Sequence, residues 1–275
     1  MTYVDGKIAA LTGAGSGIGR ALALQLNREG CELFLSDISA ASLNETLALL
    51  PRQDVPADGQ VLDVADKTSV YAWAEKIAEA KGHVDIVINN AGVALISNVE
   101  NNRYEDFEWL MGINFWGVVY GTQAFLPLLR QSQQGHLVNI SSVFGLFSAP
   151  TQSAYNAAKF AVRGYTEALR QEMDGSNVHV CCVHPGGIKT NIARAARSED
   201  SDVNADERDT EFQKLAHTSP EKAAAQIIAA IEKHKKRLLI GMDARFFSLV
   251  CRLFPVRYPQ ILGLLTGNAS TKLVK

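Results

Sequence analysis

The chain has 275 residues, of which 47% are hydrophobic and 20% are charged, and its formal net charge is −2. This composition is typical of a globular protein with a sizeable core, and the charge gives no reason to expect a nucleic acid as partner. The N-terminus lacks a basic region followed by an apolar run, no apolar run reaches the ~18 residues of a membrane span, and we expect a cytoplasmic protein.

Short apolar runs alternate with helical patterns along the chain. We expect strands at 7–11, 32–37, 59–64, 84–89, 136–141, 178–183 and 237–240. We expect helices at 17–28, 39–50, 67–80, 104–130, 153–173 and 219–234. Most of the strands are continuously apolar, which is typical of a parallel sheet covered by helices on both faces. The pattern therefore predicts an α/β fold with a doubly wound parallel sheet of about seven strands, in one domain covering 1–275.

A glycine-rich loop follows the first predicted strand. It contains Gly13, Gly17 and Gly19, with Gly15 extra, in the pattern GxxxGxG rather than GxGxxG. Glycines let the backbone turn sharply and approach a pyrophosphate, and the N-terminus of the next helix offers N–H groups to it. The loop therefore predicts a dinucleotide site, the alternative being an ordinary glycine-rich turn.

Asp37 ends the second predicted strand, at the distance from the glycines where an acid usually accepts the adenosine ribose hydroxyls. A carboxylate there repels a 2′-phosphate, and no Arg or Lys follows it closely. We therefore expect NAD rather than NADP, although Asp37 could also be a turn residue at a strand end.

Tyr155 and Lys159 lie four residues apart in an alanine-rich segment that should be helical, so both side chains share one face. A nearby ammonium favours the phenolate and lowers the pKa of a tyrosine. A tyrosine tuned in this way can pass a proton to or from a substrate oxygen. Alone, the pair is weak evidence, because this spacing occurs by chance on many amphipathic helices in which the lysine is merely solvated.

These motifs together resemble the short-chain dehydrogenase/reductase family in its short, single-domain form. The resemblance rests on TGAGSGIG at 12–19, LDV at 62–64, NNAG at 89–92, Asn114, Ser142, Tyr155 with Lys159, and Pro185-Gly186. It is strong over 5–190 and weak over 219–240. It implies a Rossmann-type fold.

The resemblance also implies a role for each matching residue. Tyr155 would be the general acid/base, Lys159 would lower its pKa and bind the nicotinamide ribose, Ser142 would hold the substrate oxygen, and Asn114 would join a proton relay. The remaining cofactor contacts would come from Gly13, Ser16, Gly17, Ile18, Gly19, Asp37, Asp63, Val64, Asn90, Ala91, Gly92, Pro185, Gly186, Ile188 and Thr190. No metal is expected, because the histidines and cysteines lack ligand spacing.

Two segments lie outside the motifs. The stretch 186–218 reads as irregular, and we expect a mobile lid over the substrate or a solvated loop. The apolar, basic tail 243–275 could pack on a partner subunit, wall the pocket, or touch a membrane surface through 243–265, and packing is favoured.

Apolar residues beside the site favour a lipophilic secondary alcohol or ketone as substrate. The expected protein is an NAD-dependent oxidoreductase and a homo-oligomer, either a dimer or a tetramer. The alternatives are an NADP-dependent carbonyl reductase and a catalytically idle NAD-binding regulator.

Overall fold

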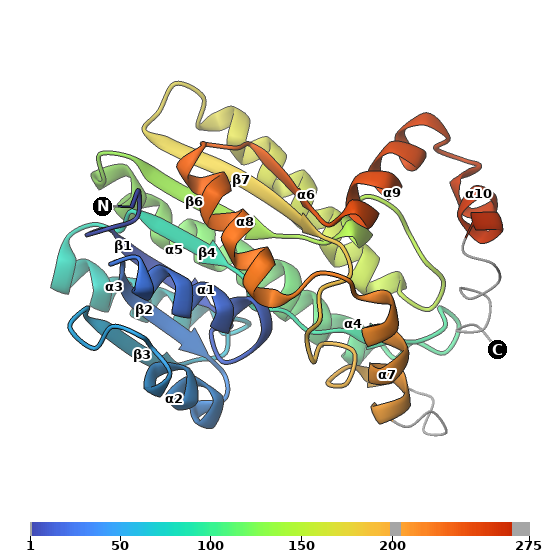
Figure 1. Cartoon of the computed structure of the whole chain (residues 1–275), viewed down its shortest axis with the longest axis horizontal. Coiled ribbons are helices and arrows are strands. Elements are labelled where there is room, and N and C mark those ends of the chain that lie inside the picture. The colour runs from blue at the N-terminus through green and yellow to red at the C-terminus, as the bar shows by residue number, and fades with distance from the viewer. Residues whose placement is uncertain (1, 199–204, 266–275) are drawn as a thin grey trace.

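A seven-stranded parallel sheet forms the centre of the protein, as the alternating pattern predicts. The structure is a computed structural model that describes residues 2–198 and 205–265 (Figure 1). In spatial order the strands are β3 (Ala57–Val61), β2 (Glu32–Asp37), β1 (Ile8–Thr12), β4 (Ile86–Asn89), β6 (Gly135–Ile140), β7 (Val178–Pro185) and β9 (Arg237–Ile240). Every neighbouring pair is parallel.

Helices cover both faces of the sheet. One face carries α1 (Gly17–Arg28), α2 (Ala40–Ala48) and α8 (Pro220–Glu232). The other carries α3 (Lys67–Lys81), α5 (Gly117–Gln131) and α6 (Ser153–Glu172). Within β1, Ala9 and Leu11 belong to the first core while Ile8 and Ala10 belong to the second. Adjacent strand residues point to opposite faces, which explains why these strands are apolar throughout.

The strand order reverses between β1 and β4. Connections leaving these two adjacent strands go to opposite sides, which leaves a crevice at their carboxyl ends. Figure 1 shows α4 (Tyr104–Met111), α7 (Ala205–Leu215), α9 (Met242–Leu253) and α10 (Tyr258–Leu265) beyond this edge of the sheet. The crevice is therefore bordered by the loops and helices that follow the carboxyl ends of the strands.

Three predicted elements differ in the structure. The third strand is β3, and it ends at Val61 instead of reaching Val64. The single helix expected at 104–130 is divided into α4, a π-helical turn η1 (Gly112–Trp116), and α5. The stretch 186–218 is not irregular throughout: β8 (Arg197–Ser198) pairs with β5 (Leu95–Ile96), and α7 follows. Its residues 199–204 lie outside the described part, and the expected lid motion stays a prediction.

The described part of the tail, up to residue 265, forms two helices, and α9 packs one face on the body of the protein; residues 266–275 lie outside the described part. Ala244 is fully buried, and Phe247 and Cys251 pack with it against Val143 and Phe147. Val143 begins the short helix η2 (Val143–Gly145), directly after Ser142. Among the described residues, no helix combines the length and the apolar character needed to cross a membrane.

Candidate active site

The phosphate loop, Gly13–Gly19, joins β1 to α1 in a conformation that requires glycine. Gly13 and Gly17 have φ values of +67° and +52°. A Cβ at Gly19 would collide with the carbonyl oxygen of Gly13. Ser16 precedes α1 in an extended conformation, but its side chain makes no capping hydrogen bond. The first N–H groups of a helix have no intrahelical acceptor, so this end of α1 fits the phosphates of a dinucleotide.

A network of hydrogen bonds attaches the phosphate loop to the end of β4. The side-chain amide of Asn90 donates to the carbonyl oxygens of Thr12 and Gly13, at 3.0 and 3.1 Å. In return, the Thr12 hydroxyl oxygen accepts from the backbone N–H groups of Asn90 and Ala91, at 3.0 and 3.1 Å. Thr12 was not assigned a role from the sequence, yet it joins the two strands that border the crevice.

Asp37 lies at the edge of the phosphate loop. Its carboxylate accepts from the backbone N–H groups of Gly15, at 2.8 Å, and Ser39, at 2.9 Å. Asp63 and Val64, the other predicted adenosine contacts, follow β3 in the chain. Asp63 is exposed, whereas Val64 is buried and a Cβ on Gly117 would collide with it.

Ser142, Tyr155, Lys159 and Asn114 are all buried, with at most 9% of each residue exposed. Lys159 places its Nζ 5.6 Å from the centre of the Tyr155 ring and donates to the carbonyl oxygen of Ile140 at 3.1 Å. Ser142 hydrogen-bonds the Tyr155 side chain. The predicted arrangement on one face of α6 is therefore present, next to the end of β6.

Asn114 lies in the π-helical turn η1. Its side-chain oxygen accepts from the N–H of Val93, and its amide donates to the carbonyl oxygen of Val93, both at 2.8 Å. A Cβ on Gly92 would lie 3.2 Å from the Asn114 oxygen and 3.5 Å from the Lys159 nitrogen. Single π turns within α-helices occur frequently at functional sites. Here the turn brings Asn114, Gly92 and Lys159 together.

The pKa of Tyr155 shifts in the opposite direction from the prediction. Burial raises it to about 12, and the hydrogen bond with Ser142 offsets only part of that rise. Burial also lowers the pKa of Lys159 to about 8. Desolvation disfavours the charged form of both groups, so the lysine is a weaker source of positive charge than an exposed ammonium. Burial and Ser142 account for this shift, and the lowering of the Tyr155 pKa by Lys159 stays a prediction.

The segment after β7 completes the crevice. Gly186 donates to the carbonyl oxygen of Ile240 at 2.9 Å, and Ile188 pairs with Thr218. A Cβ on Gly17 would lie 3.0 Å from Cγ2 of Thr190. Gly17 of the phosphate loop and Thr190 after β7, both predicted cofactor residues, therefore lie next to each other across the crevice.

Asp243 is a site residue that sequence reasoning missed. It lies in the first turn of α9, and its Oδ2 accepts from the backbone N–H of Gly187 at 2.6 Å. A Cβ on Gly186 would collide with this carboxylate. The sequence offered no signal beyond an acid after Gly241, because the contact joins segments 56 residues apart.

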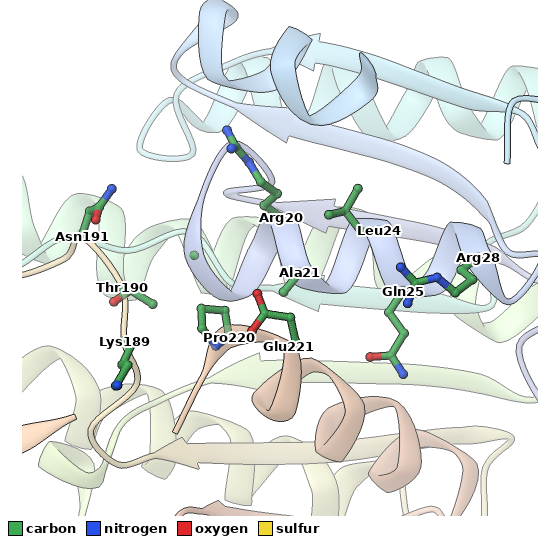
Figure 2. Close-up of a pocket in the computed structure, with 11 residues that line it drawn as sticks. Arg20, Ala21, Leu24, Gln25, Arg28, Lys189, Thr190, Asn191, Pro220 and Glu221 are labelled. Carbon is green, nitrogen blue, oxygen red and sulfur yellow. The ribbon is translucent and has the colours of Figure 1, made fainter. Parts of the chain in front are cut away.

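A groove of about 240 Å³ lies beside the phosphate loop, between α1 and α8 (Figure 2). Gly17 and Thr190 belong to its wall, as do Arg20, Lys189 and Glu221. Neither Ser142 nor Tyr155 lines it. The groove therefore adjoins the expected phosphate position rather than the expected site of chemistry.

Apolar side chains surround Tyr155. Its ring meets Phe144 edge to face at 6.1 Å, and Phe144 meets Phe147 at 5.2 Å. Leu95 and Leu110 are buried in the same cluster, with Val93 and Ala94 packed against it. The phenol therefore lies among apolar side chains, as the sequence predicts.

Comparisons with known proteins agree with this geometry. The family model described as short chain dehydrogenase matches residues 7–201. The chain is 44% identical over 265 residues to a putative oxidoreductase, SadH, of Mycobacterium tuberculosis, covering 96% of each chain. A short-chain dehydrogenase/reductase from Burkholderia phymatum, solved with NAD, is 30% identical with a TM-score of 0.81, covering 95% of this chain and 96% of that one. An alcohol dehydrogenase from Thermococcus sibiricus, solved with 5-hydroxy-NADP, is 25% identical with a TM-score of 0.73, covering 85% and 95%.

Proposed function

The chain belongs to the short-chain dehydrogenase family, and we propose that it transfers a hydride between NAD(H) and a lipophilic secondary alcohol or ketone. The observation that carries this proposal is the convergence of Ser142, Tyr155 and Lys159 beside the crevice bordered by the phosphate loop. NAD(H), when bound, supplies or accepts the hydride, and the protein supplies orientation and proton transfer.

Tyr155 is the proposed general acid/base. Because its pKa is about 12, the phenol is protonated at neutral pH, and this form donates a proton to the oxygen of a ketone as that oxygen gains negative charge. Ser142 is a second hydroxyl donor to the same oxygen, and two donors aimed at a developing oxyanion stabilise it. Oxidation of an alcohol needs the deprotonated phenol instead.

Lys159 and Asn114 are the proposed supports of this pair. Lys159 is held by the carbonyl oxygen of Ile140, and its remaining N–H groups are available to the nicotinamide ribose. Asn114 fixes Val93 by two hydrogen bonds and so keeps the Gly92 backbone against Lys159.

Asp37 supports NAD over NADP. Its carboxylate lies at Gly15 of the phosphate loop, where it can accept ribose hydroxyls and would repel a 2′-phosphate. Arg20 is the cation that follows the glycines, and its guanidinium group already binds Glu45 at 2.6 Å and the carbonyl oxygen of Gly15 at 2.6 Å. It is therefore engaged with the protein rather than free for a phosphate.

The apolar surroundings of Tyr155 support a lipophilic substrate. Phe144 meets the Tyr155 ring edge to face, and Leu95 and Leu110 are buried in the cluster behind it, so on this side the phenol lies in surroundings without hydrogen-bonding side chains. A sugar would leave its hydroxyls unpaired there, which costs on the order of 1–3 kcal/mol for each buried group.

A spectrophotometric screen tests the proposal. Reduced nicotinamide should form from NAD and lipophilic secondary alcohols, and Tyr155→Phe should lower turnover at least 100-fold while NADH still binds. Tyr104→Phe is the matched control, because this tyrosine is 83% exposed. NADH binding without turnover on any alcohol or ketone would instead support an idle regulator, and unchanged turnover in Tyr155→Phe would refute the acid/base assignment.

A further inference from the structure

The outward side of α9 is apolar although nothing in the described structure covers it. Four side chains form this outer face: Met242, Phe246, Leu249 and Leu253, with exposed fractions of 75%, 44%, 57% and 61%. At about 100° per residue these positions fall within roughly 60° of the helix circumference, so they make one continuous ridge. Phe254 and Val256 extend the ridge past the end of the helix, with 47% and 82% exposed.

Arginines border this ridge. Arg245 and Arg252 lie about two turns apart along the same flank of α9, Arg257 follows the helix, and all three are exposed. None of the three has an ion-pair partner within the described ranges. Although the whole chain has a net charge of −2, the sequence 243–275 contains Arg245, Arg252, Arg257, Lys272 and Lys275 and a single carboxylate side chain, Asp243.

From this arrangement we propose that the outer face of α9 docks on an anionic phospholipid surface. A helix with an apolar ridge flanked by cations lies in the membrane interface, with the ridge among the acyl chains and the cations at the headgroups. Each cation near an anionic surface contributes about 1 kcal/mol.

A second copy of the chain fits the same face less well. Two-fold pairing would place the same three arginines of each copy in one small interface. The only carboxylate of this segment is Asp243, and it already accepts from Gly187 at 2.6 Å. The charges therefore favour an anionic lipid surface as the partner of this face. Self-association through other faces of the protein is compatible with this proposal.

The docking face and the proposed site share one helix. Phe247, on the inner side of α9, meets Phe147 at 4.9 Å, and Phe147 adjoins the Phe144 ring that meets Tyr155. Docking would therefore hold the apolar side of the site near the lipid. The consequence that lipid-dissolved substrates reach the site directly rests on the proposed function, whereas docking itself does not.

Vesicle flotation of the purified full chain tests the docking. The chain should float with vesicles of mixed phosphatidylcholine and phosphatidylglycerol, far less with phosphatidylcholine alone, and binding should weaken as salt rises. Arg245→Gln with Arg252→Gln should lower the partition coefficient roughly 30-fold. Leu249→Asp with Leu253→Asp should abolish flotation, while Val99→Asp, at another exposed apolar position, should not change it.

Three outcomes would overturn the proposal. They are absence of flotation with the anionic vesicles, equal flotation with neutral ones, and flotation that survives both double variants. Circular dichroism confirms that each variant is folded, and the arginine variant, being confined to exposed side chains, remains informative if the leucine variant unfolds. Sedimentation velocity adds a further check: loss of an oligomer in the leucine variant, without flotation of the parent chain, would assign the face to a second copy.

Discussion

Replacing Asp243 by Ala removes the carboxylate that connects α9 to the segment after β7. In the structure Oδ2 of Asp243 accepts from Gly187 at 2.6 Å, and Gly187 is adjacent to the predicted nicotinamide contacts Gly186 and Ile188. Asp243→Ala leaves this N–H without its acceptor. We expect the segment to lose its fixed position and the cofactor to bind more weakly.

The size of the effect follows from the bond and its surroundings. A hydrogen bond to a charged group contributes about 1.5–3 kcal/mol. Because Asp243 is only half-buried, the lower value applies. A loss of about 1.5 kcal/mol is a little more than tenfold in a binding constant. The same loss would lower Tm by roughly 3–6 °C in a protein of this size.

NADH fluorescence titration at a temperature where all variants are folded measures the effect. Asp243→Ala should raise the Kd for NADH about tenfold, and Asp243→Asn, which keeps an acceptor oxygen, should recover most of the affinity. Asp174→Ala, at an exposed acid, is the control. If Asp243→Ala bound NADH within twofold of the parent chain, the positioning role would be refuted even if its Tm fell.

Three further predictions concern the phenol, the phosphate loop and acid stability. The pKa of Tyr155 is about 12, so alcohol oxidation should accelerate about tenfold per pH unit from pH 7 to 10, and a flat profile with chemistry rate-limiting would contradict the burial argument. Gly19→Ala should abolish NADH binding in titrations, because its methyl group would collide with the carbonyl oxygen of Gly13; normal affinity would show that the loop can adjust. Burial beside His179 and His234 lowers the pKa of His136 to about 3, so it stays neutral in the fold but is protonated in the unfolded chain below about pH 6.5. The contribution of neutral His136 to the free energy of unfolding is therefore lost as pH falls from about 6.5 toward 3, and roughly 2 kcal/mol is lost by pH 5. Urea unfolding should show a correspondingly smaller loss of stability between pH 7.5 and 5 for His136→Asn than for the parent chain. An unchanged loss would contradict the assignment.

Local patterns predicted the elements that local physics determines. The continuous apolar runs predicted the inner strands, since these strands are buried on both faces, whereas the edge strand β3 is neither apolar throughout nor buried. The glycines of the phosphate loop were recognisable because positive φ and close backbone approach exclude other residues at Gly13 and Gly19. Tyr155 and Lys159 followed from helical spacing and from the family resemblance.

Long-range contacts and burial were not predictable in this way. Asp243 reaches Gly187 only because β9 lies next to β7, and nothing near either residue signals that pairing. The π turn around Asn114 was not predictable, because Gly112 and Gly117 at its ends are equally compatible with an uninterrupted helix. The direction of the Tyr155 pKa shift depends on the burial of its side chain, which a helical spacing does not reveal.

Hydride transfer itself is tested most directly with an isotope-labelled alcohol. The purified chain is incubated with NAD and secondary alcohols carrying deuterium on the carbinol carbon, and the reduced nicotinamide is analysed by mass spectrometry. We expect deuterium in the reduced cofactor with the parent chain and at least 100-fold less product with Tyr155→Phe. Reduced cofactor without deuterium, or equal product from the Tyr155→Phe variant, would contradict the account.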